Sequence, residues 1–393
     1  MYHQRIIRDQ GIIEAGYIPL LAYATIPEII MNRRSFLKTS ATAPLAAAAS
    51  SVLPLGSALA QGAPGTDGWR IFEVTKRVEV LKPVGTTRVW LPTPSIVDTS
   101  YQKSLGNAWQ ADGGKADLVT DAKYGAGIVS ATFADGAKPV LSLTSRFATR
   151  NYSVNPAGGR GMQSSSDELR RYLAATEFMP TDGIVKTTAD GIVKGAKTDI
   201  DKAKLIYEWV VENTYRDAKV RGCGTGDVKF MLENNSYGGK CGDLNALFVA
   251  LCRSVGVPAR DVYGIRVADS QRGYKSLGKA GDITRAQHCR AEFYAQNIGW
   301  IPVDPADVRK VMLEEEGGKK IDDPKVVAAR QFLWGNWEMN WLAYNSAHDV
   351  AMPGSVKSRL VFFMYPNAET ADGRLDQLDP DSFKYTITSR EVV

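Results

Sequence analysis

The sequence predicts an α+β fold in which an all-β, sandwich-like domain precedes a mixed domain of helices and strands. Short runs rich in β-forming residues, interrupted by Gly and Pro, fill residues 69–150. Apolar residues at helical spacing begin near residue 166, and further strand-like runs follow beyond residue 259. Helices followed by antiparallel strands are typical of an α+β domain.

Length and composition indicate a folded chain of several domains. The 393 residues are 44% hydrophobic and 23% charged, which are the fractions of an ordinary globular protein and not of a disordered one. A chain of this length usually divides into two or three domains of roughly 100–200 residues. The formal net charge is +5, with no dense Lys/Arg cluster, so we expect no nucleic-acid partner.

Residues 1–60 are predicted to be a leader. Arg33-Arg34 opens a segment typical of twin-arginine export signals, which continues with an apolar run and a small-x-small cleavage site at Ala41–Leu55 and Ala58-Leu59-Ala60. We expect Met31 to be the true start, with residues 1–30 upstream of it. The mature chain should then be periplasmic or secreted, without an integral membrane segment, and the twin-arginine machinery should be its partner during export.

The β-sandwich-like domain is predicted over residues 61–155. Its strands should be the four runs that are rich in β formers and roughly alternate apolar with polar residues, at 70–80, 87–91, 125–133 and 140–147. The Gly-rich segment 155–161 is the predicted linker.

Residues 165–315 are predicted to form the second domain. A helix is expected from Asp201 to Asn213, with Asp199 as its candidate cap, and another from Cys241 to Val255, stopped by Gly256. Strands should follow at 259–267, 288–295 and 300–304. We expect residues 316–393 to be a C-terminal extension that packs on this domain, with a core stripe at helical spacing formed by Trp334, Trp337 and Trp341.

Cys241 begins a predicted helix, and this position favours a nucleophile. Unpaired N–H groups and the positive end of the helix dipole both stabilise a thiolate there. Gly238 and Gly239 let the backbone turn sharply just before it. The Cys241 N–H is placed to donate a hydrogen bond to a developing oxyanion.

Histidine is scarce, which narrows the choice of a base for Cys241 to His3, His288 and His348. His288 lies in a predicted strand, and antiparallel pairing with the next strand would bring Asp304 beside it. A carboxylate in that place fixes the imidazole tautomer and stabilises the imidazolium. His348 is the rival base, outside this region. Strand alternation puts Cys289 on the face opposite His288, which predicts a structural role for it.

The remaining cysteines leave alternatives open. Any one pair among Cys223, Cys252 and Cys289 could form a disulfide in an oxidising compartment, and the sequence does not choose which. We interpret Cys252 as a buried free thiol. No C-x-x-C spacing is present, so we expect no metal and no cofactor.

Three blocks, spread over roughly residues 200–310, resemble the transglutaminase-like superfamily. They are Gly239-Lys240-Cys241 with the following Leu247–Arg253 and Gly256–Arg260, then His288–Tyr294, then Gly299–Pro305. The resemblance implies a papain-like α+β core in which Cys241 is the nucleophile, His288 the base and Asp304 the orienting acid. It also implies an enzyme family of cross-linkers, peptidases and amidases that includes some inactive members.

The expected function is an exported cysteine hydrolase of the peptidase or amidase type, which acts on a peptide, protein or other amide through an acyl-enzyme. Two alternatives stay open: transfer of the acyl group to an amine, as in transglutaminases, and a non-catalytic binding module that keeps the fold. Cross-linking members carry a Trp upstream of the nucleophile that helps to stabilise the oxyanion. No Trp lies between Trp209 and Cys241 here, so the second oxyanion donor is unassigned and hydrolysis is favoured.

Overall fold

The computed structural model describes residues 68–392. The predicted leader, with Arg33-Arg34 and the cleavage site at Ala58-Leu59-Ala60, lies outside the described residues. The described part is an α+β fold, as predicted. None of its helices combines the length and the apolar character that a membrane span requires.

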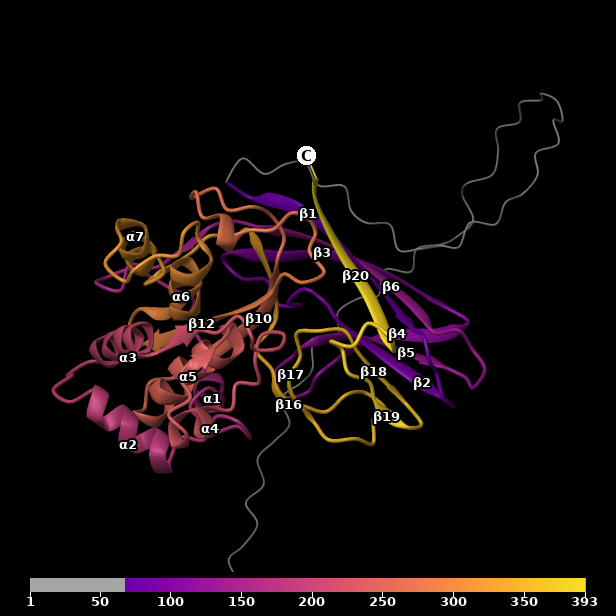
Figure 1. Ribbon diagram of the computed structural model, residues 1–393, viewed down its shortest axis with the longest axis horizontal. Helices are drawn as coiled ribbons and strands as arrows, with labels where there is room; N and C mark the ends of the chain where they lie inside the picture. Colours follow the sequence, from indigo (N-terminus) through magenta and orange to yellow (C-terminus); the bar gives the residue numbers. More distant parts are fainter. Residues whose placement is uncertain (1–67, 393) are drawn as a thin grey trace, which may run out of the picture. The chain divides into compact units, whose positions relative to one another are not determined.

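Two five-stranded antiparallel sheets contain the strands predicted near the N-terminus (Figure 1). Their strand orders are β11-β20-β1-β6-β3 and β19-β18-β2-β5-β4. The strands that begin in this region are β1 (Arg70–Val80), β2 (Thr87–Pro92), β3 (Gln102–Asp112), β4 (Gly114–Thr120), β5 (Gly127–Phe133) and β6 (Val140–Thr149). Strands β3 and β4 were not predicted, because almost none of their side chains is buried and they carry little apolar alternation.

The two sheets share one apolar core. Its buried side chains come from β1 and β6 of one sheet and from β2 and β5 of the other, and include Val78, Leu91, Phe133 and Leu143. Side chains of two sheets that interdigitate in this way form the core of a sandwich.

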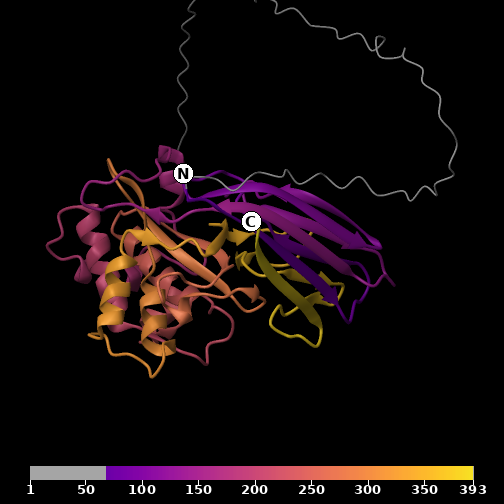
Figure 2. The same ribbon diagram turned by 90° about the horizontal axis from the view of Figure 1, so that it is seen from above.

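The C-terminal part of the chain returns to these sheets. Strand β20 (Phe383–Val392) pairs with β1 along its whole length, and β18 (Asn367–Thr370) pairs with β2 and with β19 (Gly373–Arg374). Figures 1 and 2 show these yellow strands beside the indigo and purple ones. The sheets are therefore built from both ends of the described chain.

A four-stranded sheet of order β13-β12-β10-β15 forms the centre of the helical region. Its strands are β10 (Ala259–Arg266), β12 (Gln287–Ala295), β13 (Gly299–Val303) and β15 (Trp341–Asn345), the first three at the predicted places. Helix α5 (Cys241–Ser254) is buried along its whole length and packs on β12 and β10. The other helices are α1 (Ser166–Arg171), α2 (Gly183–Ile192), α3 (Asp199–Asn213), α4 (Val228–Glu233), α6 (Pro305–Glu314) and α7 (Pro324–Phe332).

Two local predictions need correction. The cap of α3 is Thr198, whose side chain accepts a hydrogen bond from Asp201 N at 3.1 Å, and not Asp199. Trp337 and Trp341 are fully buried, as expected, but they lie on strands and not on a helix. Helix α7 ends at Phe332, and Gly335, with φ of 98°, turns the chain before the strands begin.

The remaining short elements join the larger ones. Strands β8 and β9 pair in parallel just before α5, and β11 pairs with β20. These elements are β7 (Tyr152–Ser153), β8 (Tyr215–Arg216), β9 (Gly238–Gly239), the 3-10 helix η1 (Lys275–Leu277), β11 (Gly281–Asp282), β14 (Asn336–Trp337), β16 (His348–Val350) and β17 (Leu360–Phe362).

Candidate active site

Cys241 is the first residue of α5, as predicted, and its side chain is buried. Asp243, two residues later, fixes the backbone around it. One carboxylate oxygen accepts a hydrogen bond from Lys240 N at 3.0 Å, and the other accepts from Thr225 N at 2.9 Å and Gly226 N at 3.0 Å. The Cys241 N–H donates no hydrogen bond to another residue of the described chain. That N–H is therefore available to an oxyanion.

The loop that carries Cys223 lies directly against the start of α5. Cys223 O accepts a hydrogen bond from Gly242 N at 2.8 Å, and a Cβ at Gly242 would lie 2.6 Å from that oxygen. Gly224 has φ of 90°, and a Cβ there would lie 1.8 Å from an Asp243 oxygen. Both positions need glycine, and the close approach places the Cys223 thiol beside the Cys241 thiol.

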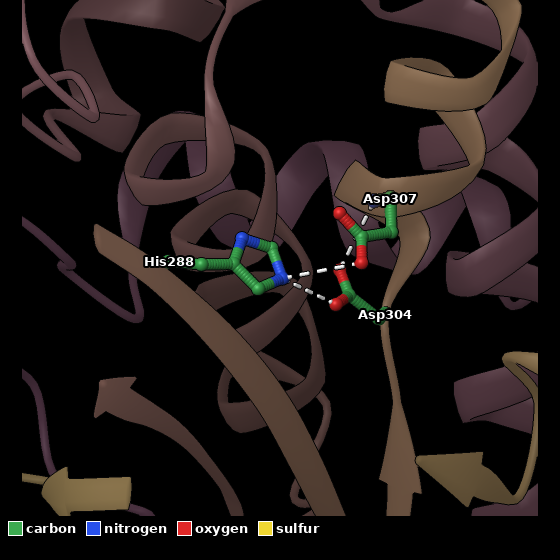
Figure 3. A group of neighbouring side chains, drawn as sticks. All are labelled: His288, Asp304 and Asp307. Atoms are coloured by element: carbon green, nitrogen blue, oxygen red, sulfur yellow. Dashed lines mark hydrogen bonds and ion pairs between the residues drawn. The ribbon is translucent and has the colours of Figure 1, made fainter. Parts of the chain in front are cut away.

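His288 and Asp304 meet as the antiparallel pairing of β12 with β13 predicts. Nε2 of His288 lies 2.7 Å from Oδ2 of Asp304 and 3.4 Å from Oδ2 of Asp307, as Figure 3 shows. Asp304 also caps α6, because it accepts a hydrogen bond from Asp307 N at 3.1 Å. With Nε2 held by the carboxylates, Nδ1 is the ring nitrogen that can exchange a proton with the sulfur.

Two guanidinium groups balance these carboxylates. Arg266 donates to Asp307 at 2.6 Å, and Nε of Arg290 lies 3.7 Å from Oδ2 of Asp304. The pKa of Asp307 is held well below its usual value, because Arg266 and His288 outweigh the effect of burial. Burial and the neighbouring Asp307 raise the pKa of Asp304.

The same side chains have the composition of a metal site. The candidate ligand atoms of His288, Asp304 and Asp307 all lie within 4.8 Å of one another. Two carboxylates and an imidazole suit a divalent cation in type. Arg266 and Arg290, however, already compensate the two carboxylates, so a divalent cation would meet two positive charges at close range. The charge balance favours a cluster that orients His288.

The Cys241 thiol and the His288 imidazole shift each other's pKa toward an ion pair. Burial and Arg266 disfavour a charge on His288, but Asp307 and Asp304 outweigh both and raise the pKa of His288 to about 10. Hydrogen bonding from the thiols of Cys223 and Cys289, together with the hydrogen bond and charge of His288, outweighs burial and holds the pKa of Cys241 well below its usual value. A thiolate beside an imidazolium is therefore the favoured state at neutral pH.

The other thiols keep their protons. Interaction with Cys241 and burial raise the pKa of Cys223 and of Cys289, and burial raises that of Cys252. All four cysteines are free thiols in the described part. Cys289 interacts with Cys241 closely enough to affect its pKa, but its side chain is buried in the apolar core and does not line the cavity described next.

Cys241 and His288 line one cavity of about 930 Å³, which we call the active-site cavity. Cys223, Gln287 and Tyr365 line it as well. The rival base His348 does not line it; that side chain is buried at the Tyr263 hydroxyl and lies 3.5 Å from Asp261. The structure thus gathers the three predicted residues and leaves His348 apart.

Several residues around the site escaped the sequence analysis. Asp307 stands three positions after Asp304, at the first turn of a helix that begins with Pro305, and that local pattern signals a helix start and no more. Asn245 bridges the site, donating to Cys289 O at 2.9 Å and to Asp304 at 3.3 Å. Neither Asn245 nor Cys223 carries a signal in the sequence, because Asn245 acts only when α5 packs on β12 and Cys223 only when its loop packs on the start of α5.

Comparisons with known proteins show which family the chain resembles. The family model described as transglutaminase-like superfamily matches residues 186–305. An uncharacterized protein of Haemophilus influenzae is 35% identical over 343 residues, which cover 82% of this chain and 92% of that one.

Two of the solved structures that match the chain share little sequence with it. The crystal structure of a proposed cysteine protease from Cytophaga hutchinsonii has a TM-score of 0.45 and 16% identity, over 82% of this chain and 98% of that one. The periplasmic domain of TgpA from Pseudomonas aeruginosa has a TM-score of 0.32 and 17% identity, over 60% of this chain and 89% of that one.

Proposed function

Because the chain belongs to the transglutaminase-like superfamily, we propose that it is a cysteine hydrolase of peptide or other amide bonds, with Cys241 as nucleophile, His288 as acid and base, and Asp304 as the group that orients His288. One observation carries the proposal. Cys241, whose pKa is depressed, lines the same cavity as His288, whose Nε2 is held by Asp304 at 2.7 Å. Nucleophile, base and orienting acid in this relation are the requirements of acyl transfer.

In the acylation step, the Cys241 thiolate attacks the carbonyl carbon of the substrate and forms a C–S bond. The carbonyl oxygen takes the negative charge and accepts a hydrogen bond from the Cys241 N–H. His288 gives its Nδ1 proton to the nitrogen of the leaving amine, and the C–N bond breaks. The product is a thioester on Cys241 and a free amine.

In the deacylation step, a water molecule attacks the thioester carbon and gives a proton to Nδ1 of His288. The C–S bond breaks, the carboxylic acid leaves, and the thiolate and imidazolium are restored. Asp304 stabilises the imidazolium in both steps, because its carboxylate stays at hydrogen-bond distance from Nε2.

The leader pattern at Arg33-Arg34 supports export, and we propose that the hydrolase works in the periplasm or outside the cell.

Alkylation with iodoacetamide tests the nucleophile and its base. We expect fast labelling of Cys241 alone below pH 8, located by mass spectrometry, because the pKa values of the other three thiols are raised. His288→Ala should slow this labelling at least tenfold, while the control His348→Gln should leave it unchanged. Similar labelling of all four thiols, or an unchanged rate in His288→Ala, would contradict the proposal.

Hydrolysis itself is tested on a set of peptide amides. Release of amine should require Cys241 and be lost in Cys241→Ala at unchanged thermal stability. A chain that labels rapidly at Cys241 but never releases an amine, and whose Cys241→Ser variant keeps its biological role, would instead be the binding module that the sequence left open.

A further inference from the structure

The active-site cavity is strongly cationic. Eight Lys and Arg side chains line it, against the single carboxylate of Asp282. The whole chain carries a formal net charge of only +5, so the excess is concentrated around the proposed nucleophile. A cavity lined by charges of one sign focuses the field and raises the local concentration of oppositely charged ligands.

Half of these cations are already paired within the protein. Arg216 and Lys310 both contact Glu314, Arg221 contacts Asp376, and Arg266 contacts Asp307. Because Arg216 and Lys310 share Glu314, these four cations face three carboxylates and keep one positive charge in excess.

The other four form no ion pair with any residue between 68 and 392: Lys240, Lys279, Arg285 and Lys384. Asp282 carries one negative charge and so offsets at most one of these four positive charges. Its carboxylate accepts a hydrogen bond from Thr284 N at 3.0 Å, and Lys279 and Arg285 are the cations that act on it from nearby. At least three positive charges remain uncompensated. Lys240 directly precedes Cys241, so one of these cations belongs to the residue next to the nucleophile.

The proposed catalytic groups do not cancel this excess. The carboxylates of Asp304 and Asp307 are matched by the guanidiniums of Arg266 and Arg290, and the Cys241 thiolate is matched by the His288 imidazolium. The catalytic cluster is thus neutral as a whole. The four unpaired cations set the sign of the field that a substrate meets.

We propose that the acyl donor is an acidic peptide, whose carboxylates lie close to the amide bond that is cleaved and bind Lys240, Lys279, Arg285 and Lys384. This inference rests on the proposed hydrolase function, since it takes the amide from that proposal and the anionic character from the cavity. A volume of about 930 Å³ suits a short peptide segment. Carboxylates next to the scissile bond would place their charge where Lys240 stands.

A pair of small alkylating reagents tests the field without any turnover. Iodoacetate and iodoacetamide attack the same sulfur and differ in charge. We expect the ratio of the iodoacetate rate to the iodoacetamide rate at Cys241 to exceed the same ratio for a small free thiol by about tenfold at low ionic strength. In 0.5 M salt this ratio should fall toward that of the free thiol. Lys279→Gln/Arg285→Gln should lower the ratio, while Lys138→Gln, an exposed lysine outside the cavity, should leave it unchanged. A ratio equal to that of the free thiol overturns the inference.

Binding distinguishes the class of anion. Fluorescence anisotropy with the Cys241→Ala variant should show that a labelled Glu-containing tetrapeptide amide binds about tenfold more tightly than its Gln counterpart. Equal affinity for the two peptides, or displacement of the acidic peptide by a single-stranded oligonucleotide at an equal concentration of charge, overturns the peptide assignment. If iodoacetate is preferred and the acidic peptide binds but no amide is cleaved, the hydrolase proposal fails while the anion-binding site stands.

Discussion

Replacement of Asp304 by Asn tests the central relation of the proposed mechanism. The Asn side chain keeps the shape of Asp and can still contact Nε2 of His288, which lies 2.7 Å from the carboxylate. The substitution therefore removes a charge with little change in packing. Asp307 remains at 3.4 Å, but Arg266 binds it at 2.6 Å and compensates most of its charge. We expect the imidazolium of His288 to lose most of its stabilisation.

The size of the effect follows from the geometry. Two unit charges about 4 Å apart interact by about 4 kcal/mol at an effective dielectric constant near 20, and a pKa change of one unit corresponds to about 1.4 kcal/mol. The loss of one such interaction lowers a pKa by about three units. The pKa of His288 should then fall from about 10 to about 7 in Asp304→Asn. The thiolate loses its stabilised partner at the same time, so the pKa of Cys241 should rise.

The assay is the pH dependence of iodoacetamide labelling at Cys241 between pH 5 and 11, with circular dichroism as a check that the fold persists. The acidic inflection reports the thiol, and the alkaline inflection reports loss of the imidazolium proton. A His pKa that is raised by folding means that the ion pair is intact below it and is lost as pH rises through it. If the alkaline inflection of Asp304→Asn coincides with that of the unsubstituted protein, Asp304 does not raise the pKa of His288 and the reasoning fails.

Two further predictions concern the loop beside the nucleophile. Gly224→Ala should lower the free energy of unfolding, measured in urea titrations, by about 2–5 kcal/mol, because it combines a left-handed backbone with a Cβ pressed against Asp243. The control Gly125→Ala, at a position with φ of 72° and open space around it, should lower that free energy by only about 1–2 kcal/mol. Equal losses in the two variants would contradict the packing argument. Cys223→Ala should raise the pKa of Cys241 by about one to two units, since a hydrogen bond to a charged group contributes about 1.5–3 kcal/mol. The acidic inflection of iodoacetamide labelling should move to higher pH by the same amount. An unmoved inflection would show that Cys223 does not stabilise the thiolate.

The elements that the sequence predicted are those whose signal is local. Helix α5 has apolar residues at helical spacing and is followed by Gly256, whose φ is 82° and which ends the helix. The bounds of α5 could therefore be predicted from the sequence. Strands β12 and β13 could be placed, and their antiparallel pairing brings Asp304 to His288, because a turn with Gly299 joins two adjacent apolar runs.

The features that the sequence did not predict depend on contacts between distant segments. Strand β20 pairs with β1 across more than 300 positions, and no local pattern specifies which distant strand becomes its partner. The approach of Cys223 to Cys241 depends on two glycines and on the carboxylate of Asp243, each unremarkable in the chain by itself. The cationic cavity is likewise invisible in the sequence, because its unpaired lysines and arginine come from separate segments and the overall charge is small.

The charge of the cavity also bears on the choice between hydrolysis and transfer to an amine. An alkyl amine such as a lysine side chain is almost entirely an ammonium ion at neutral pH, since its usual pKa is about 10.4. The field that attracts an acidic acyl donor toward Lys240, Lys279 and Arg285 repels such an acceptor, while water carries no charge and is unaffected. With a fluorescent alkyl amine and an acidic peptide amide, we expect hydrolysis to exceed transfer and the share of transfer to rise with salt. Hydroxylamine, an uncharged nucleophile at neutral pH, should intercept the acyl-enzyme without this salt dependence. Dominant transfer to the ammonium-bearing amine at low salt would show that the field of the cavity does not control the acceptor.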